Sequence, residues 1–200
     1  MKKLGIVLII IGISIVGWFG YKHWLNLQSM KELHGNVVKH EDNDTSSLHF
    51  LDNQSEPIDH SNGEEVAILV MPSIGISYDV FWGTGDNVLA KGVGMYESDV
   101  TTTPDQKGHT VLSGHRDSVF RPVGELQDGD SIYVQYQGQD YEYKINKTWI
   151  TDAQDQNVII NKDEPTLTLT TCYPFEFIGD APDRYIIQAE YVQEGHLLDL

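Results

Sequence analysis

From residue 65 onward the chain consists of short, strand-like segments separated by turn-forming residues, and this pattern restricts its fold most strongly. The clearest case is residues 128–150, where a turn at Asp128 leads into residues 131–136 and Gly138 leads into an alternating run at 141–150. A period of two, bounded by glycine, is typical of a β-hairpin. The segment therefore predicts two antiparallel strands.

Similar segments precede and follow this hairpin. We expect strands at residues 66–71, 74–82, 109–113, 119–126, 158–160, 166–171 and 184–192, and one short helix at 86–92, with Asp86 as its N-cap and Gly92 at its end. Helices do not alternate with these strands, so the pattern disfavours a parallel α/β sheet. About eight short strands with few helices predict a mostly β fold with a single β-barrel.

The N-terminal residues have a different character. Residues 4–21 contain no charged side chain, and Lys2 and Lys3 precede them. As a helix this run extends over roughly 27 Å, which is just enough to cross the hydrocarbon core of a bilayer. No small-residue cleavage site follows the run, which favours an uncleaved signal anchor over a signal peptide. We expect residues 1–21 to form a cytoplasmic tip and a transmembrane helix, with the rest of the chain outside the cell.

Residues 22–64 are polar and rich in turn formers, and such composition does not support a packed core. We expect an extracellular stalk here, followed by a catalytic domain at 65–193 and a tail at 194–200. The stalk holds five of the eight histidines, whose spacing matches no metal pattern. They are His23, His34, His40, His49 and His60. No metal or cofactor is expected.

The formal net charge of the chain is −17. A surface this acidic repels nucleic acids and anionic lipid headgroups, so neither is an expected partner. Two acidic segments, residues 99–108 and 152–164, could shape a binding groove or bind a cation, although their carboxylates show no metal-ligand spacing.

Cys172 is the only cysteine of the chain, so it cannot form an intramolecular disulfide or a multi-cysteine zinc site. Strand alternation places Leu167, Leu169 and Thr171 on one face and Cys172 on the other. Because the leucines take the core, the thiol is expected to point outward at the strand's end, where Pro174 stops the ladder. This placement favours a nucleophile over a buried structural cysteine.

A nucleophilic thiol needs a proton partner, because a free cysteine with a pKa of about 8.5 is mostly protonated at neutral pH. Three histidines lie outside the stalk. His109 opens a strand and is expected to be structural, and His196 lies in the tail. His115 follows Gly114 at the end of a strand, which favours it as the acid or base, with an ordinary surface histidine as the alternative.

Attack on an amide produces an oxyanion, which needs fixed hydrogen-bond donors. Arg184 opens a strand-like segment and cannot lose its charge, so it is the candidate for this role. The alternative is an ion pair with Asp180 or Asp183.

Three short motifs together resemble the sortase family. Residues 168–172, Thr-Leu-Thr-Thr-Cys, are similar to the sortase Thr-Leu-x-Thr-Cys signature; residues 113–117, Ser-Gly-His-Arg-Asp, are similar to its histidine motif; and Arg184 lies where the family has its arginine. Residues 91–94, 111–120, 170–175 and 181–187 are most similar to class D sortases of Gram-positive bacteria. The resemblance covers residues 66–192 and implies an eight-stranded sortase-type β-barrel. Met95 departs from it, because relatives often have a histidine there.

The resemblance implies a membrane-anchored cysteine transpeptidase. Cys172 would attack the peptide bond after Thr in an LPxT-type sorting signal of a surface protein. His115 would be the acid for the leaving amine and then the base for the incoming one. Arg184 would stabilise the oxyanion or hold the substrate backbone, and Thr171 would contribute to the same substrate-binding pocket. A peptidoglycan precursor amine would resolve the thioacyl intermediate. The alternatives are a hydrolytic cysteine peptidase on the same fold and a non-catalytic surface binding module.

Overall fold

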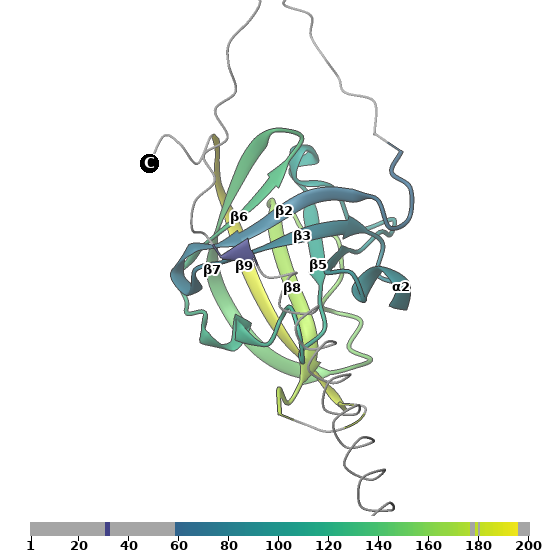
Figure 1. Ribbon diagram of the computed structural model, residues 1–200. Helices are drawn as coiled ribbons and strands as arrows, with labels where there is room; N and C mark the ends of the chain where they lie inside the picture. Colours follow the sequence, from purple (N-terminus) through teal and green to yellow (C-terminus); the bar gives the residue numbers. More distant parts are fainter. Residues whose placement is uncertain (1–30, 33–58, 177–178, 180, 196–200) are drawn as a thin grey trace, which may run out of the picture.

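The computed structural model describes residues 31–32, 59–176, 179 and 181–195. Nine strands and one short α-helix make up most of it (Figure 1). The strands are β1 (Lys31–Glu32), β2 (Glu65–Met71), β3 (Ile76–Trp82), β4 (Val93–Met95), β5 (His109–Ser113), β6 (Ser131–Tyr136), β7 (Gln139–Asp152), β8 (Thr166–Tyr173) and β9 (Asp183–Gly195). The helix is α2 (Asp86–Leu89), and 3-10 turns occupy Pro72–Ile74, Pro104–Gln106 and Pro122–Glu125.

Eight of the strands close into a barrel. Their order is β3-β2-β6-β7-β9-β8-β5-β4, and a further pairing between β3 and β4 completes the ring. The β3–β4 and β5–β8 pairs are parallel, and the remaining pairs of the ring are antiparallel. The predicted eight-stranded barrel is thus confirmed. The two-residue β1 pairs with the first residues of β3, outside the ring.

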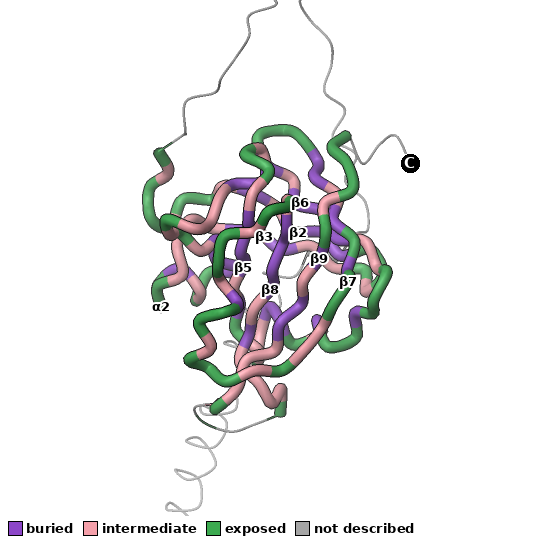
Figure 2. The backbone as a smooth tube through the Cα atoms, turned by 180° about the vertical axis from the view of Figure 1, so that it is seen from behind, coloured by how far each residue is buried: buried purple, intermediate pink, exposed green. Residues whose placement is uncertain are grey.

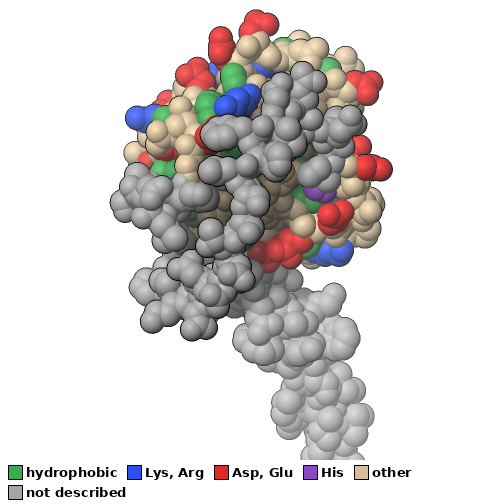
Figure 3. Space-filling model, turned by 90° about the horizontal axis from the view of Figure 1, so that it is seen from above, with side chains coloured by type: hydrophobic (Ala, Val, Ile, Leu, Met, Phe, Trp, Pro, Cys, Tyr) green, Lys and Arg blue, Asp and Glu red, His purple; other side chains and the backbone are tan. Residues whose placement is uncertain are grey.

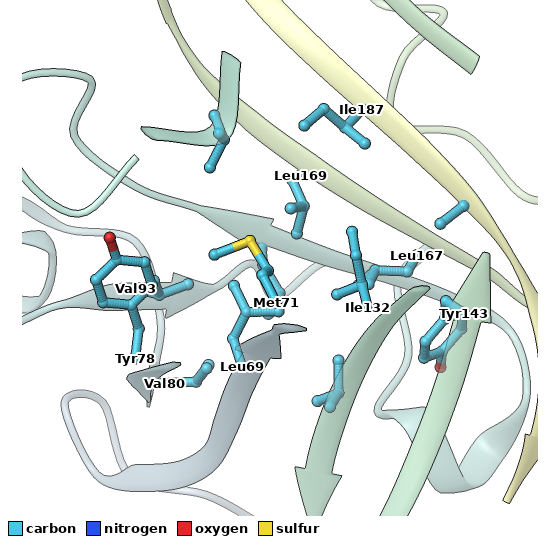
Figure 4. Packing of buried hydrophobic residues seen from close by; sticks show 14 of the residues in the cluster. Leu69, Met71, Tyr78, Val80, Val93, Ile132, Tyr143, Leu167, Leu169 and Ile187 are labelled. Carbon is cyan, nitrogen blue, oxygen red and sulfur yellow. The ribbon is translucent and has the colours of Figure 1, made fainter. Parts of the chain in front are cut away.

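The barrel interior is filled by alternate side chains of these strands. Leu69 and Met71 of β2, Ile132 of β6 and Leu167 and Leu169 of β8 are at most 1 % exposed. Figure 4 shows these side chains gathered in one cluster, and Figure 2 shows buried positions along the strands. Each such aliphatic side chain contributes about 1.5–3 kcal/mol through the water it excludes. The core therefore fixes the strands whose ends carry the predicted site.

Two predicted strands are wrong and one was missed. Residues 119–126 are not extended, because Pro122 begins a 3-10 helix that puts Val123 into the core together with Val119, Phe120 and Leu126. Residues 158–160 form bends, and only Val158 among them is buried. The three-residue β4 escaped prediction because glycine flanks and interrupts it.

The helix and His60 also differ from expectation. Helix α2 has Gly85 as its N-cap and ends at Leu89, so it is shorter than predicted.

His60 is not a solvated stalk residue: its side chain is 8 % exposed. Its ring lies 4.9 Å from that of Trp82, and its Nε2 lies 2.8 Å from the Tyr136 hydroxyl. These contacts attach the start of the domain to β3 and β6.

The predicted transmembrane run at residues 4–21 lies outside the described residues, as do most of the predicted stalk, residues 196–200 and His196. Within the part of the chain that the structure describes, no helix is long and apolar enough to cross a membrane. Acidic side chains are visible at several separate places on the face seen in Figure 3.

Candidate active site

The site begins where two parallel strands end side by side. Ser113, the last residue of β5, is the register partner of Thr170 in β8. The amide of Gly114 continues this ladder and donates to the Thr170 carbonyl at 3.3 Å. One residue beyond Gly114 is His115, and two beyond Thr170 is Cys172. The barrel thus brings the predicted base and the predicted nucleophile to the same rim.

Strand β9 adds the third predicted residue from the other side of β8. Cys172 and Arg184 are direct partners in the antiparallel β8–β9 pair. All three residues line one cavity of about 710 Å³. Three adjacent strands therefore position the three groups, although the residues are separated by up to 69 positions in the chain, from 115 to 184.

The three side chains differ in exposure and in partners. Cys172 is half-buried, as the alternation of β8 predicted, and His115 is exposed. Arg184 is half-buried, and its Nη1 donates to the carbonyl oxygens of Asp183 at 3.0 Å and Ala181 at 3.3 Å. These bonds are to backbone, so the Asp183 ion pair considered above is not the contact seen. Because guanidinium carries five N–H donors, Arg184 can be held by its loop and still donate to a substrate.

Thr171 connects the two halves of the site. Its side chain is buried, and its hydroxyl donates to the Gly114 carbonyl at 2.7 Å. This bond fixes the backbone directly before His115. Gly114 itself has no room for a side chain, since an added Cβ would lie 2.8 Å from the Phe120 ring. Thr171 lines the cavity, but its hydroxyl is engaged with the protein.

One wall of the cavity is the segment that follows β7, within the acidic stretch that the sequence singled out as a possible groove. Residues 151–156, Val158 and Ile159 line it. The Asp155 carboxylate accepts from the Thr151 hydroxyl at 2.5 Å and from the Asn157 amide at 2.9 Å, and these bonds lower the pKa of Asp155. Residues from the segment between β3 and β5 also line the cavity, namely Thr84, Leu89, Tyr96, Ser98 and Val100. The cavity is thus a groove between two segments far apart in sequence.

His109 attaches Ile160, which directly follows the cavity-lining Ile159, to strand β8 of the barrel. Its ring is 2 % exposed, with Nδ1 2.7 Å from the Ile160 carbonyl and Nε2 2.8 Å from the Thr168 hydroxyl. A carbonyl can only accept, so Nδ1 carries the proton and Nε2 accepts from Thr168. Burial lowers the pKa of His109, which favours this neutral form. The structural role predicted for His109 is confirmed.

Met95 has no part in the groove. It is 1 % exposed within β4 and belongs to the hydrophobic core. Across the described residues, no three His, Cys, Asp or Glu side chains converge in a way that could hold a metal ion.

Comparison with known proteins agrees with this geometry. The sortase domain family matches residues 69–192. Sortase D of Bacillus subtilis is 35 % identical over 199 residues, which are 96 % of this chain and 100 % of the relative. Among solved structures, the catalytic domain of B. anthracis SrtD is 52 % identical, with a TM-score of 0.61 over 72 % of this chain and 97 % of that one. A Clostridium perfringens sortase D5 transpeptidase is 29 % identical, with a TM-score of 0.61 over 68 % of this chain and 83 % of that one.

Proposed function

Since the chain belongs to class D of the sortase family, whose members are cysteine transpeptidases, we propose that it cleaves an LPxT-type sorting signal after threonine and joins the surface protein to a peptidoglycan amine. The supporting observation is that Cys172, His115 and Arg184 meet on one rim and line one groove. In addition, a sortase C of C. perfringens with 28 % identity has been solved with a C-terminal cell-wall sorting motif.

In the first half-reaction the Cys172 thiol gives its proton to His115, and the sulfur bonds to the threonine carbonyl carbon. The developing oxyanion accepts hydrogen bonds from the Arg184 guanidinium, whose position on β9 opposite Cys172 suits this role. His115 protonates the leaving amine as the C–N bond breaks, which leaves a thioacyl enzyme.

In the second half-reaction an acceptor amine attacks the thioacyl carbon. His115 takes the proton from the attacking nitrogen, the C–S bond breaks, and the Cys172 sulfur leaves with its electron pair. The exposure of His115 gives both the leaving and the incoming amine access to its ring.

The proposed setting is the outer face of a membrane. Residues 1–21 would anchor the chain, residues 22–64 would form the stalk, and the domain at 65–193 would face the cell wall, with the tail at 194–200. The uncharged run at 4–21 supports this proposal, as does the association of sortases with cell surfaces and membranes.

The test is cleavage of a Leu-Pro-x-Thr-x peptide by the full chain in detergent, with and without an amine, followed by mass spectrometry. Cys172→Ala should abolish cleavage, while His115→Ala and Arg184→Ala should nearly do so, with thermal unfolding as the control for folding. Full activity in Cys172→Ala would refute the proposal. A product that is free acid even with excess amine would instead indicate the hydrolytic peptidase.

A further inference from the structure

A second cavity, of about 810 Å³, lies beside the catalytic residues and shares no lining residue with the groove. We infer that this cavity binds the amine acceptor, so that the two substrates approach Cys172 from different sides. The inference rests on the proposed transpeptidase function. It assigns to the acceptor a place separate from the one that holds the sorting signal.

Residues that are adjacent in the sequence line the two cavities. Tyr173 follows Cys172 and Tyr185 follows Arg184, and both tyrosines line the second cavity. Cys172 and Arg184 line the groove, whereas the next residue of each strand lines the second cavity, so the two spaces adjoin at this end of the β8–β9 pair. Residues 117–119, just after His115, also line the second cavity. Each catalytic residue thus has a chain neighbour in it.

The order of the reaction requires such an arrangement. In the thioacyl intermediate the acyl part of the sorting signal is still bound in the groove, and only the side from which the peptide after threonine has left is open to the acceptor. The acceptor must reach the same carbon and the same His115 ring from that side. The second cavity is a large space that adjoins these residues.

The cavity has a preformed aromatic wall. The rings of Tyr173, Phe175 and Tyr185 contact one another, with centroids 5.2–6.1 Å apart. Gly124 lies against Phe175, since an added Cβ there would be 2.9 Å from that ring. Arg116 joins the two segments that flank the cavity by donating to the Gly179 carbonyl at 2.5 Å. These contacts keep the space open and shaped without a ligand.

The charges around the cavity match an amine. Three carboxylates, those of Asp117, Glu125 and Glu176, line it with one guanidinium, that of Arg121. An amine is mostly an ammonium ion at neutral pH, and such an acidic entrance raises its local concentration. Aromatic faces also attract cations. The ammonium loses one proton to water, and the neutral nitrogen then attacks and gives its second proton to His115.

The test varies the cavity and measures the acceptor alone. Glu125→Gln combined with Glu176→Gln removes two negative charges, and Gly124→Ala displaces the Phe175 ring, which an added Cβ would approach to 2.9 Å. Glu164→Gln is the matched control, because Glu164 is exposed and lines neither cavity. The full chain is given an LPxT peptide and increasing triglycine amide, and ligated and hydrolysed products are counted. Hydroxylamine serves as a second nucleophile, small and uncharged enough to need no cavity.

The half-saturating concentration of triglycine amide should rise about fivefold in the double charge variant, since two exposed charge interactions are weakened. This effect should shrink at high salt, whereas that of Gly124→Ala should not. Peptide cleavage and reaction with hydroxylamine should stay at wild-type levels in both variants. The double variant changes only surface side chains, so it remains informative even if Gly124→Ala fails to fold.

Unchanged amide dependence in the double charge variant would overturn the inference, as would an equal loss of peptide cleavage, which would assign the cavity to the sorting signal's leaving end. If the wild type cleaves no LPxT peptide, it is the proposed function that fails, not the placement of the acceptor.

Discussion

The two halves of β8 belong to one strand and both pair with β9, yet they differ in their surroundings. Residues 166–169 are all buried, whereas Thr170, Cys172 and Tyr173 are half-buried. β5 ends at Ser113, beside Thr170, so the last residues of β8 extend past their parallel neighbour. The first half is held on every side, and the second has a free face on which chemistry can occur. A reactive group thus gains both rigidity and access from a single strand.

If the halves have separate roles, a change in the buried half should affect stability and leave the chemistry intact. Leu169→Ala should lower the free energy of unfolding by about 2–5 kcal/mol, because it opens a cavity in the core. Urea denaturation measures the loss. Activity per folded molecule should stay at the wild-type level; a loss of activity in fully folded protein would show that the halves are not separable.

Thr171 lies at the boundary, so its variants should affect both properties. Thr171→Val leaves the Gly114 carbonyl without its donor, which should cost about 1–3 kcal/mol. It should also lower kcat more than it raises the KM for the peptide, because the backbone before His115 is released.

Thr171→Ser keeps the hydroxyl and is the matched control. It should recover most of the lost kcat. A serine variant as slow as the valine variant would show that the hydrogen bond to Gly114 is not what positions His115.

The smallest effect is expected in the pH dependence of stability, through His109, which contacts the buried half of β8. His109 bonds to Thr168, and its pKa is lowered chiefly by burial, with Lys162 as the nearby charge that acts in the same direction. The unfolded chain therefore binds the proton more readily than the folded one. Stability should be full above the ordinary histidine pKa of about 6.5 and fall as the pH drops below it.

His109→Gln removes this titration. The difference in unfolding free energy between wild type and variant should therefore shrink on acidification, and thermal or urea unfolding at several pH values measures it. Parallel pH curves for the two proteins would exclude His109 as the group responsible.

The sequence was most informative where a local rule and the barrel agree. The hairpin at 131–150 follows from the alternation of its two strands. The outward direction of Cys172 follows from alternation in β8, because this strand buries its leucines. Position and chemistry favoured His115 and Arg184, the motif resemblance supported both, and the structure places them on the rim with Cys172.

Other features depend on contacts that a single sequence does not display. The parallel β3–β4 and β5–β8 pairs join distant segments, and nothing in either segment specifies its partner. Residues 119–126 have the composition of a strand, but Pro122 and the closing of the core favour a 3-10 helix. His60 appeared to be part of a polar linker, and only the folded barrel provides Trp82 and Tyr136 to enclose it.

The most direct test of the central claim is intact-mass spectrometry of the full chain mixed briefly with an LPxT peptide and quenched in acid. We predict a protein adduct with the mass of the acyl part ending in threonine, absent in Cys172→Ala and lost on adding triglycine amide as ligated peptide appears. Cleavage without any adduct, or an adduct that persists in Cys172→Ala, would contradict the account.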